Sequence, residues 1–328
     1  MSTPKRRGER SASVEDLESP SSSTPIAAVD THHHLWDLAV SHYGWLHPNP
    51  EGDPFPDFEQ ICRDYTLDDY RADIEGAQIA KSVHLQAEHD ANDPVRETAW
   101  LQSIADDPAS GGFPHAIVAG ADLARADAEA VLETQAGHAN VRGIRQILNQ
   151  HATSASGAPA DEALASRAAQ LSDPAWLRSF ALLRRFDLSF ELQLFAWQQE
   201  EARALLAHDE IPIVLDHTLM PFDRSAEGMA AWRKGLAFFA DHPQVVLKIS
   251  GLGMVPGGWD PDWSRSVVTQ AIDAFGADRC FFGSNFPIDG LVTDYTSIWQ
   301  VYRDAIEPLS EDEQTALLRT NAERVYRI

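Results

Sequence analysis

Cysteine is scarce in this chain, which has only Cys62 and Cys280 among its 328 residues. Two cysteines cannot build a disulfide framework for a chain of this length, so the sequence is typical of a reducing compartment. Long apolar runs are also missing, because no stretch reaches the roughly 18 consecutive apolar residues that a membrane-spanning helix needs. No apolar segment follows the basic residues at positions 5–7, as it would in a secretory signal. We therefore expect a soluble, cytoplasmic protein without a membrane partner.

Basic residues are few relative to acidic ones. The chain has 26 Lys and Arg against 50 Asp and Glu, a formal net charge of −24 at pH 7. A protein with this negative charge repels the phosphate backbone of a nucleic acid, because nucleic-acid binding depends on Lys and Arg displacing counterions. Hydrophobic residues, with nine Trp among them, make up 44% of the chain, which is enough for a large buried core. A small molecule is thus the expected partner, and nucleic acid is not.

Residues 1–25 differ in composition from the rest of the chain. Seven of them are Ser, four are basic and four are acidic, and their apolar residues show no periodicity. Such a segment cannot bury enough apolar surface to fold, so we expect a disordered tail. Residues 26–328 carry all of the negative excess and are expected to form one domain.

Short β-rich runs alternate with helical segments after the tail. The runs that predict strands are Ile26–Thr31, Ile79–Ala87, Phe113–Gly120, Val141–Leu148, Leu188–Leu194, Ile211–Asp216, Val245–Ser250 and Cys280–Ser284. The segments that predict helices are Leu67–Ala77, Pro94–Ala105, Ala124–Thr134, Pro174–Arg185, Gln198–His208, Gly228–Ala240, Trp263–Phe275, Thr296–Ile306 and Glu311–Arg324. Eight such β/α units indicate an α/β fold of the (β/α)8 TIM-barrel type. An open doubly wound sheet is the alternative, but no glycine-rich phosphate loop follows the first strand.

Three of the predicted strands alternate polar with apolar residues. The polar sets are Ser82, His84, Gln86 and Glu88 in the second strand, Ser189, Glu191 and Gln193 in the fifth, and Lys248 and Ser250 in the seventh. Because the outer face of a barrel packs against helices, we expect the polar sets to point inward. An antiparallel sheet with one solvated face would show the same alternation. Burying charged side chains inside a barrel costs free energy, so we expect them to have a function. Substrate binding by His84 and Lys248 is one such function.

The end of the first strand carries two histidines in a His-x-His spacing. His32 and His34 lie two residues apart, so both imidazoles face the same way, whereas His33 points to the opposite side. Such a pair can hold one metal ion or one substrate oxygen, although it also arises by chance in turns. The end of a barrel strand is where enzymes of this fold carry their chemistry, which favours a functional role.

Further candidate residues end other strands. His217 follows the sixth strand and Arg145 ends the fourth, so both would converge with the histidines at one mouth. His217 taken by itself also suits a capping or packing role. Trp36 lies in the long loop after the first strand, where it could form part of an aromatic lid or pin that loop to the rim.

These stretches resemble the amidohydrolase superfamily, and within it the hydrolases of sugar lactones and of a pyrone dicarboxylate. The matching segments are Asp30–Trp36, Arg142–Arg145, Val214–His217, Leu247–Gly251, Phe282–Pro287 and Asn321–Tyr326. The resemblance implies a barrel in which His32, His34, His217 and an acid of the eighth strand surround a carbonyl carbon. It also implies either a zinc ion or, as in a metal-free lactonase, direct binding of the carbonyl by the histidines.

The eighth strand departs from the family pattern. Where the commoner motif reads Gly-Ser-Asp-Trp-Pro, this chain has Gly283-Ser-Asn285-Phe-Pro287. An amide neither accepts a proton as a carboxylate does nor offers charge to a cation. His32, His34 and His217 would then form a neutral ligand set, so we expect weakly bound zinc or no metal.

The leading hypothesis is hydrolysis of a lactone or related cyclic ester that carries a carboxylate or an aromatic group. The three histidines would polarise the carbonyl, and Arg145 and Lys248 would hold an anionic group. Glu88 is the first candidate for the base that activates water, with Asp289 and Glu191 behind it. Glu88 could equally neutralise Lys248 or Arg145.

Two other functions fit the same residues. Without the eighth-strand acid, carbonyl polarisation survives, so a decarboxylase, an isomerase or a rearrangement catalyst is the first alternative. A binding protein that has lost catalysis is the second, and the joint presence of His32, His34, His217 and Arg145 argues against it. Neither the substrate nor the oligomeric state follows from the sequence, which is compatible with a homo-oligomer.

Overall fold

Eight parallel strands form the centre of the computed structural model, which describes residues 26–48, 57–149 and 170–328. The predicted tail, residues 1–25, lies outside the described residues. The strands are β1 (Ala28–His33), β2 (Ile79–Leu85), β3 (Ala116–Gly120), β4 (Val141–Ile147), β5 (Ser189–Gln193), β6 (Ile213–Leu215), β7 (Val245–Ile249) and β8 (Cys280–Phe282). Each strand pairs with the next one along the chain, as expected when every pair is joined by a helical crossover.

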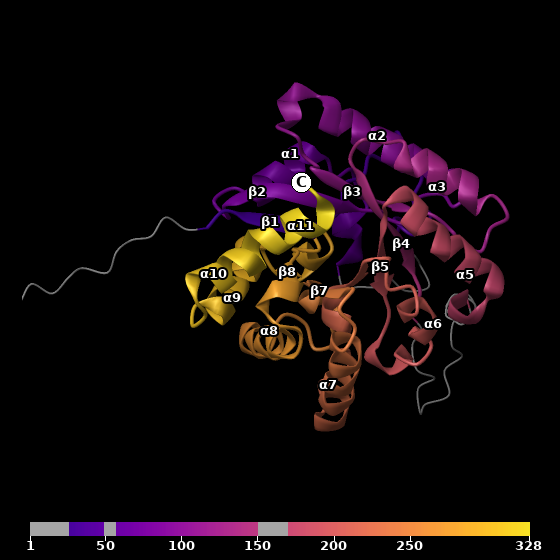
Figure 1. Ribbon diagram of the computed structural model, residues 1–328. Helices are drawn as coiled ribbons and strands as arrows, with labels where there is room; N and C mark the ends of the chain where they lie inside the picture. The colour runs from indigo at the N-terminus through magenta and orange to yellow at the C-terminus, as the bar shows by residue number, and fades with distance from the viewer. Residues whose placement is uncertain (1–25, 49–56, 150–169) are drawn as a thin grey trace, which may run out of the picture.

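The sheet curls until the end of β8 meets the end of β1 (Figure 1). Asn285 N donates a hydrogen bond to His32 O at 2.7 Å, and His34 N donates one to Phe286 O at 2.8 Å. The buried carboxylate of Asp30 accepts hydrogen bonds from Ser284 N at 2.8 Å and Ser284 Oγ at 2.7 Å. The strands thus form a nearly closed barrel, which confirms the predicted (β/α)8 fold.

Helices surround the barrel and cover its outer face (Figure 1). They are α1 (Leu67–Asp73), α2 (Val95–Asp106), α3 (Ala128–Ala136), α5 (Pro174–Phe180), α6 (Arg203–Leu206), α7 (Ala226–Ala240), α8 (Pro261–Phe275), α9 (Tyr295–Ile306), α10 (Glu311–Thr315) and α11 (Asn321–Tyr326). Side-chain caps begin several of them, and Asp260 accepts from Asp262 N and Trp263 N ahead of Pro261 in α8.

The predicted helix over residues 198–208 is the largest departure among the helices. Only Arg203–Leu206 is α-helical there. The side chain of Gln198 accepts a hydrogen bond from Phe195 N at 3.1 Å and donates one to Leu148 O at 3.0 Å. It therefore ties the start of this segment to the end of β4 instead of letting a regular helix begin.

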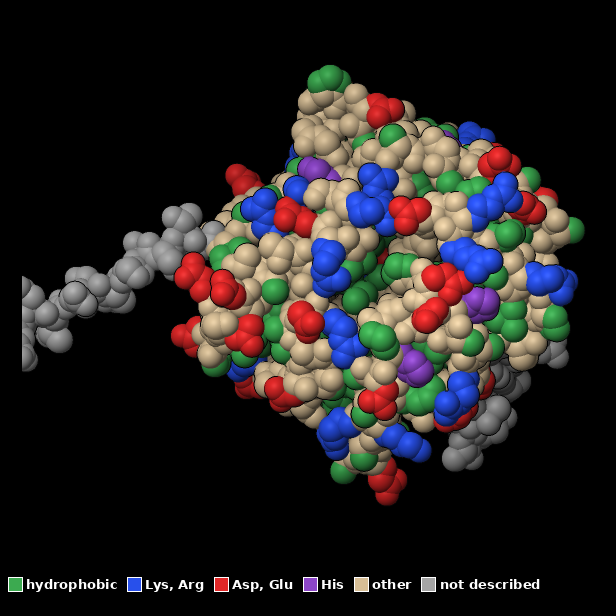
Figure 2. All heavy atoms as spheres, viewed as in Figure 1, with side chains coloured by type: hydrophobic (Ala, Val, Ile, Leu, Met, Phe, Trp, Pro, Cys, Tyr) green, Lys and Arg blue, Asp and Glu red, His purple; other side chains and the backbone are tan. Residues whose placement is uncertain are grey.

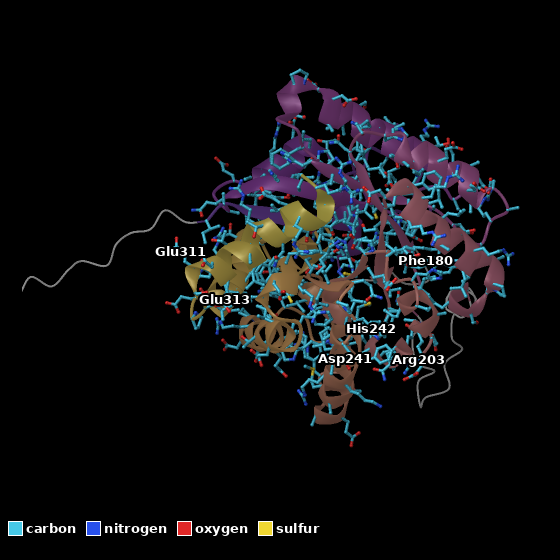
Figure 3. All side chains as sticks on the ribbon, viewed as in Figure 1. Phe180, Arg203, Asp241, His242, Glu311 and Glu313 are labelled. Atoms are coloured by element: carbon cyan, nitrogen blue, oxygen red, sulfur yellow. The ribbon has the colours of Figure 1, made fainter. Side chains whose placement is uncertain are left out.

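Two apolar layers make up the core, and side chains fill the space between strands and helices (Figure 3). The outer layer lies between strands and helices and includes Phe190 and Leu192 of β5. The smaller inner layer contains Val29, Val83, Leu85, Ala116, Val118, Val214, Val246, Phe281, Ala322 and Tyr326. The C-terminal helix α11 thus inserts its last aromatic side chain into the barrel.

The inner layer corrects the orientation predicted for β2. Val83 and Leu85 point into the barrel, so Ser82 and His84 lie on the outer face, where both contact His33. The predicted inward orientation is right for β5 and β7, whose buried Glu191 and Lys248 meet inside the barrel. Alternation alone defines two faces of a strand but not which of them faces the axis.

Charges of both signs are interspersed over the face seen in Figure 2, without a large patch of a single sign. Glu311 and Glu313 of α10 lie at the periphery (Figure 3). Among the described helices, none is both long and apolar enough to cross a lipid bilayer.

Candidate active site

A bulge in β1 turns two histidines toward the barrel mouth. Asp30 pairs with Ser82 and His33 with His84, so β1 uses one residue more than β2 over the same length. Asp30 consequently faces outward, where Tyr70 and Tyr295 donate to it, although His32 two residues later faces inward. The His33 ring stacks on Tyr70 at 4.0 Å between ring centroids, on the side opposite His32, as predicted.

A hydrogen bond fixes the tautomer of His34. Its Nδ1 lies 2.8 Å from Leu85 O, and a carbonyl only accepts, so Nδ1 carries the proton. Burial, and then the charge of Arg145, hold the pKa of His34 well below its ordinary value, so the ring is neutral. A neutral imidazole protonated at Nδ1 has only a lone pair at Nε2. His34 therefore cannot donate to a carbonyl oxygen, which corrects its predicted role as a polarising donor.

His217 reaches the same point from a left-handed turn after β6. His217, Thr218, Leu219 and Met220 have φ angles of 52°, 57°, 56° and 46°. Side chains with a Cβ rarely adopt this conformation, which costs about 1–2 kcal/mol per residue. Thr218 Oγ1 accepts from Ser250 N at 3.2 Å, and Trp232 Nε1 donates to Thr218 O at 2.8 Å, so neighbouring elements hold the turn.

A glycine at the end of β7 makes room for this ring. Gly251 has a φ of +68°, and a Cβ added there would lie 2.4 Å from Nδ1 of His217. Ser250 Oγ lies 3.2 Å from the same nitrogen, so the end of β7 both contacts and orients the imidazole.

The three imidazoles form one buried cluster. The ring centroid of His32 lies 5.2 Å from that of His34 and 4.5 Å from that of His217. Burial is the main cause that lowers the pKa of His32 well below its usual value and that of His217 to about 4. All three rings are therefore neutral at neutral pH, and their side chains converge as the sequence indicated.

A row of buried polar side chains runs beneath the histidine cluster along the inside of the barrel. His32 Nδ1 lies 3.7 Å from Asp216 Oδ1, which lies 3.3 Å from Lys248 Nζ. Lys248 Nζ is 2.7 Å from Glu191 Oε2, and Tyr326 OH donates to Glu191 Oε1 at 2.6 Å. Burial alone would raise the pKa of the Asp216 carboxyl, but Lys248 and His32 hold it well below its usual range.

The row of buried polar side chains corrects the roles predicted for Lys248 and Glu191. Both side chains are fully buried and paired with each other inside the barrel. Lys248 therefore neutralises carboxylates below the mouth and does not bind a substrate anion, and Glu191 is not placed to activate water. Asp216 and Tyr326 were not singled out from the sequence, although Asp216 directly precedes His217.

Arg145 connects the cluster to an adjoining cavity. It is 4% exposed, its guanidinium donates to Gln193 Oε1 at 3.3 Å and to Gln86 O, and its charge contributes to lowering the pKa of His34 and His217. Those two hydrogen bonds use two of its five N–H groups. The others make no hydrogen bond to described residues, so they can bind a ligand.

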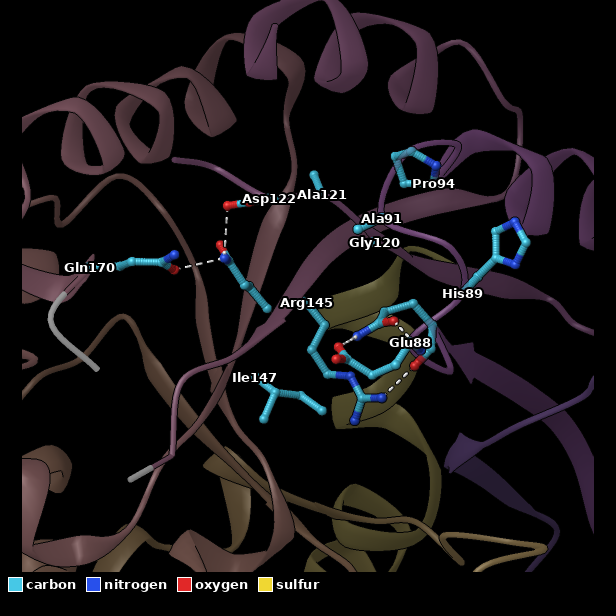
Figure 4. Close-up of a pocket in the computed structure, with 12 residues that line it drawn as sticks. Glu88, His89, Ala91, Pro94, Gly120, Ala121, Asp122, Arg145, Ile147 and Gln170 are labelled. Carbon is cyan, nitrogen blue, oxygen red and sulfur yellow. Dashed lines mark hydrogen bonds between the residues drawn. The ribbon is translucent and has the colours of Figure 1, made fainter. Parts of the chain in front are cut away.

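The cavity has a volume of about 160 Å³ and lies at the ends of β2, β3 and β4 (Figure 4). It is lined by Gln86, Glu88, His89, Ala91, Pro94, Gly120, Ala121, Asp122, Arg145, Gln146, Ile147 and Gln170. None of the three clustered imidazoles lines it, so the histidines and the cavity are two neighbouring parts that share Arg145. Glu88 and Arg145 lie together on one side of it in Figure 4.

Two polar residues of the cavity are held by hydrogen bonds. Glu88 has a φ of +56° and its N–H donates to Gln86 Oε1 at 2.6 Å, while Gln86 Nε2 donates back to Glu88 Oε1 at 3.0 Å. Gln146 donates to Asp122 Oδ1 at 3.1 Å and Gln170 Oε1 at 2.8 Å, and accepts from Trp176 Nε1. The structure thus places Glu88 beside Arg145, and Gln146 serves to shape the wall.

Two residues predicted to contact substrate lie behind the cluster. His84 is fully buried and donates from Nε2 to Leu35 O at 3.2 Å. Trp36 is also fully buried, donates to Arg63 O at 2.7 Å and stacks against His34 with ring centroids 6.4 Å apart. Both support His34 from behind, which corrects the predicted substrate contact of His84, whereas Trp36 takes the second of its two predicted roles and pins the loop after β1.

The segment after β8 contributes a buried amide and a buried carboxylate. Asn285 Nδ2 donates to Asp289 Oδ1 at 2.8 Å and lies 2.8 Å from Met254 Sδ. Asp289 Oδ2 accepts from Gly253 N at 3.1 Å. The structure therefore joins Asn285 and Asp289, two candidates that the sequence pattern did not connect.

The positions of these side chains decide whether they can hold a metal ion. In residues 26–48, 57–149 and 170–328, no group of three or more His, Cys, Asp or Glu side chains is positioned to hold one. The eighth-strand position that would add a charged ligand is an amide bonded to Asp289. As they are arranged, the described side chains therefore do not form a zinc site, and the weak or absent zinc expected from the sequence stays a prediction.

Comparisons with known proteins agree with this architecture. The family model described as amidohydrolase matches residues 29–328. An uncharacterized protein of Sinorhizobium fredii is 39% identical over 305 residues, covering 92% of this chain and 99% of the relative. An L-fucono-1,5-lactonase of Burkholderia multivorans is 29% identical over 316 residues, covering 91% of this chain and 95% of the relative. A crystal structure of a Burkholderia multivorans amidohydrolase with bound zinc superposes with a TM-score of 0.74 at 26% identity, covering 92% of this chain and 99% of that one.

Proposed function

The chain belongs to the amidohydrolase family, and on that premise we propose that it hydrolyses the ester bond of a lactone. The observation that carries the proposal is the cluster of His32, His34 and His217 at the C-terminal mouth of the barrel, with Arg145 beside it. A buried group of neutral imidazoles next to a partly free guanidinium suits a reaction at a carbonyl carbon. The similarity to an L-fucono-1,5-lactonase supports the same chemistry.

Arg145 is the group proposed to polarise the carbonyl. Its unused N–H groups are donors in a site largely closed to solvent, where a donor aimed at a developing oxyanion is worth most. His217 can assist, because its Nδ1 faces Ser250 and leaves Nε2 for the ligand. His34 offers a lone pair there and so accepts a hydrogen bond from water or substrate.

Water attack then opens the ring. The water oxygen bonds to the carbonyl carbon, the ring C–O bond breaks, and the departing oxygen takes up a proton to become a hydroxyl group. Glu88, which lines the cavity beside Arg145, is proposed as the base that takes a proton from the water. Glu191 is the weaker candidate, because it is paired with Lys248 and Tyr326 inside the barrel and does not line the cavity.

The lining of the cavity favours a hydroxyl-bearing lactone. Among the described lining residues, two carboxylates, Glu88 and Asp122, and the amides of Gln86, Gln146 and Gln170 surround one cation, Arg145. Carboxylates repel an anionic substituent, whereas carboxylates and amides both bind hydroxyl groups. We therefore favour a polyhydroxylated substrate over the carboxylate-bearing or aromatic lactone considered from the sequence.

A panel of lactones tests the proposal. Acid release from L-fucono-1,5-lactone, other sugar lactones and an aromatic lactone would be followed with a pH indicator, against the rate without enzyme. We expect turnover of at least one sugar lactone, and a loss of about 100-fold to 1,000-fold in Arg145→Met, as for other oxyanion donors. Arg303→Met is the matched control, because Arg303 likewise makes two hydrogen bonds, in its case to Ile26 O and Ala77 O. Equal losses in both variants, or no turnover by the wild type, would contradict the proposal.

A further inference from the structure

Asp289 is a buried carboxylate without a cation beside it. It is 1% exposed, and its two oxygens accept hydrogen bonds from Asn285 Nδ2 and Gly253 N. In the described part of the chain it forms no ion pair with Lys, Arg or His. Burial raises its pKa to about 7, against the opposing effect of these two hydrogen bonds.

Taken alone, a buried carboxylate without a neighbouring cation lowers the stability of the folded protein. Moving a carboxylate out of water is costly unless a cation compensates for it, and two neutral donors compensate only in part. One structural role is visible, because the contact with Gly253 ties the loop after β7 to the segment after β8. A neutral side chain of similar shape could tie these loops as well, so the charge calls for another explanation.

The carboxylate determines which way the Asn285 amide points. Above pH 7 the Asp289 carboxylate is mostly ionised and only accepts hydrogen bonds, so the amide must then present its nitrogen to it. Met254 Sδ lies 2.8 Å from the same nitrogen. The amide oxygen Oδ1 is left over, and it accepts no hydrogen bond from any described residue.

Asn285 itself belongs to the mouth of the barrel. It has a φ of +59°, and its backbone N–H donates to His32 O at 2.7 Å. Its side chain therefore projects from a backbone that is fixed directly to one of the clustered histidines. An acceptor at this position can orient a water molecule or a substrate hydroxyl beside the imidazoles.

We propose that Asp289 is a positioning residue, which fixes the Asn285 amide so that Oδ1 is presented to the reacting water or to a substrate hydroxyl. This inference rests on the proposed lactonase function, since turnover reports on it. Asn285 then orients and does not take up a proton, while Asp289 acts only through that amide.

Exchanging the two side chains tests the pair. In the double variant N285D/D289N, the amide now at position 289 can donate to the carboxylate now at position 285 and still accept from Gly253 N, so the number of hydrogen bonds is conserved. In D289N alone, the amide oxygen at position 289 can still accept from Gly253 N, but its nitrogen then faces Asn285, whose amide must turn its Oδ1 into this contact or leave one donor without an acceptor. In N285D alone, two carboxylates face each other without a donor between them.

The measurements are the urea midpoint and the separate values of kcat and KM for wild type, both single variants and the exchange variant. Asp73→Asn is the control, because it removes a carboxylate that bonds Tyr65 OH outside the site. We expect both single variants to lower the midpoint and to lower kcat about tenfold or more, with KM changed less, since orientation acts on the chemical step. The exchange variant should recover most of both losses, and Asp73→Asn should change the midpoint alone.

Two outcomes would overturn the inference. A D289N variant with a lowered midpoint but wild-type kcat would mean that Asp289 merely ties two loops together. An exchange variant no better than the single variants would mean that the two residues do not act as a pair. The midpoints need no substrate, so if the wild type opens no lactone, the proposed function fails while the midpoint recovery still decides whether the pair exists.

Discussion

Lys248 Nζ lies 2.7 Å from Glu191 Oε2, and both side chains are fully buried inside the barrel. Asp216 approaches the same ammonium at 3.3 Å and lies between it and His32. The lysine therefore compensates two carboxylates beneath the histidine cluster. The inward charges of β5 and β7 support the site from below and do not bind the ligand.

Removal of the Lys248 ammonium should be strongly destabilising. Lys248→Met leaves Glu191 and Asp216 buried without a cation, and breaking such a pair typically costs about 3–5 kcal/mol. Lys81→Met is the matched control, since the Lys81–Glu323 pair has the same 2.7 Å distance but side chains 24% and 22% exposed. We expect that control to lose about 1 kcal/mol or less. Urea unfolding of both variants decides this, and similar losses would contradict the assignment.

A methyl group at Gly251 should displace the His217 ring. Gly251→Ala places a Cβ 2.4 Å from His217 Nδ1 in a backbone with φ +68°, whereas Gly258 has φ +72° and open space around it. Both alanine variants should lose about 1–2 kcal/mol from the left-handed backbone. Only Gly251→Ala should also lower kcat/KM, by about 100-fold, because small displacements of reacting groups have large effects. Equal activity in the two variants would show that the position of His217 does not matter.

Glu97 should make the stability depend on pH. Its buried carboxyl accepts from Tyr43 OH and Ala87 N, and burial raises its pKa from 4.5 to about 7. Between these values the folded chain keeps a proton that the unfolded chain loses, so the stabilising effect present at low pH disappears as the pH rises through 7. Relative to wild type, Glu97→Gln should gain about 3 kcal/mol of unfolding free energy from pH 4.5 to pH 8. A difference between the two proteins that does not change with pH would contradict this.

Zinc should be held weakly or not at all. The described imidazoles are not arranged around one point as three ligands of an ion, and Asn285 stands where an acid would add a fourth, charged ligand. Metal analysis of protein purified without chelator or added zinc should find well under one zinc per chain. One tightly held zinc per chain would mean that the donor set around His32 has been misjudged.

The sequence was sufficient for the fold and for the segments that meet at the mouth. Eight alternating units predicted the barrel, and strand ends are where a barrel brings distant residues together. That is why the sequence alone predicts His32, His34, His217 and Arg145 as one group. The polar residues of β5 and β7 were also placed on the correct face.

Other features depend on tertiary contacts that no local pattern reveals. The alternation in β2 gives two faces, and only packing shows that Val83 and Leu85 are the inner ones. The bulge in β1 and the left-handed turn at His217 are held by distant partners such as Ser250. The pairing of Lys248 with Glu191 likewise needs two strands in register, so its role could not be read from its own segment.

If water opens a lactone at the histidine cluster, an oxygen of that water must appear in the product, and isotope labelling detects it. Wild-type protein would be incubated in ¹⁸O-water with the sugar lactone that it turns over fastest, and the product examined by mass spectrometry. Hydrolysis predicts a ring-opened acid with one ¹⁸O in its carboxylate, formed faster than without enzyme. A product without ¹⁸O, such as a decarboxylated or isomerised compound, would contradict hydrolysis.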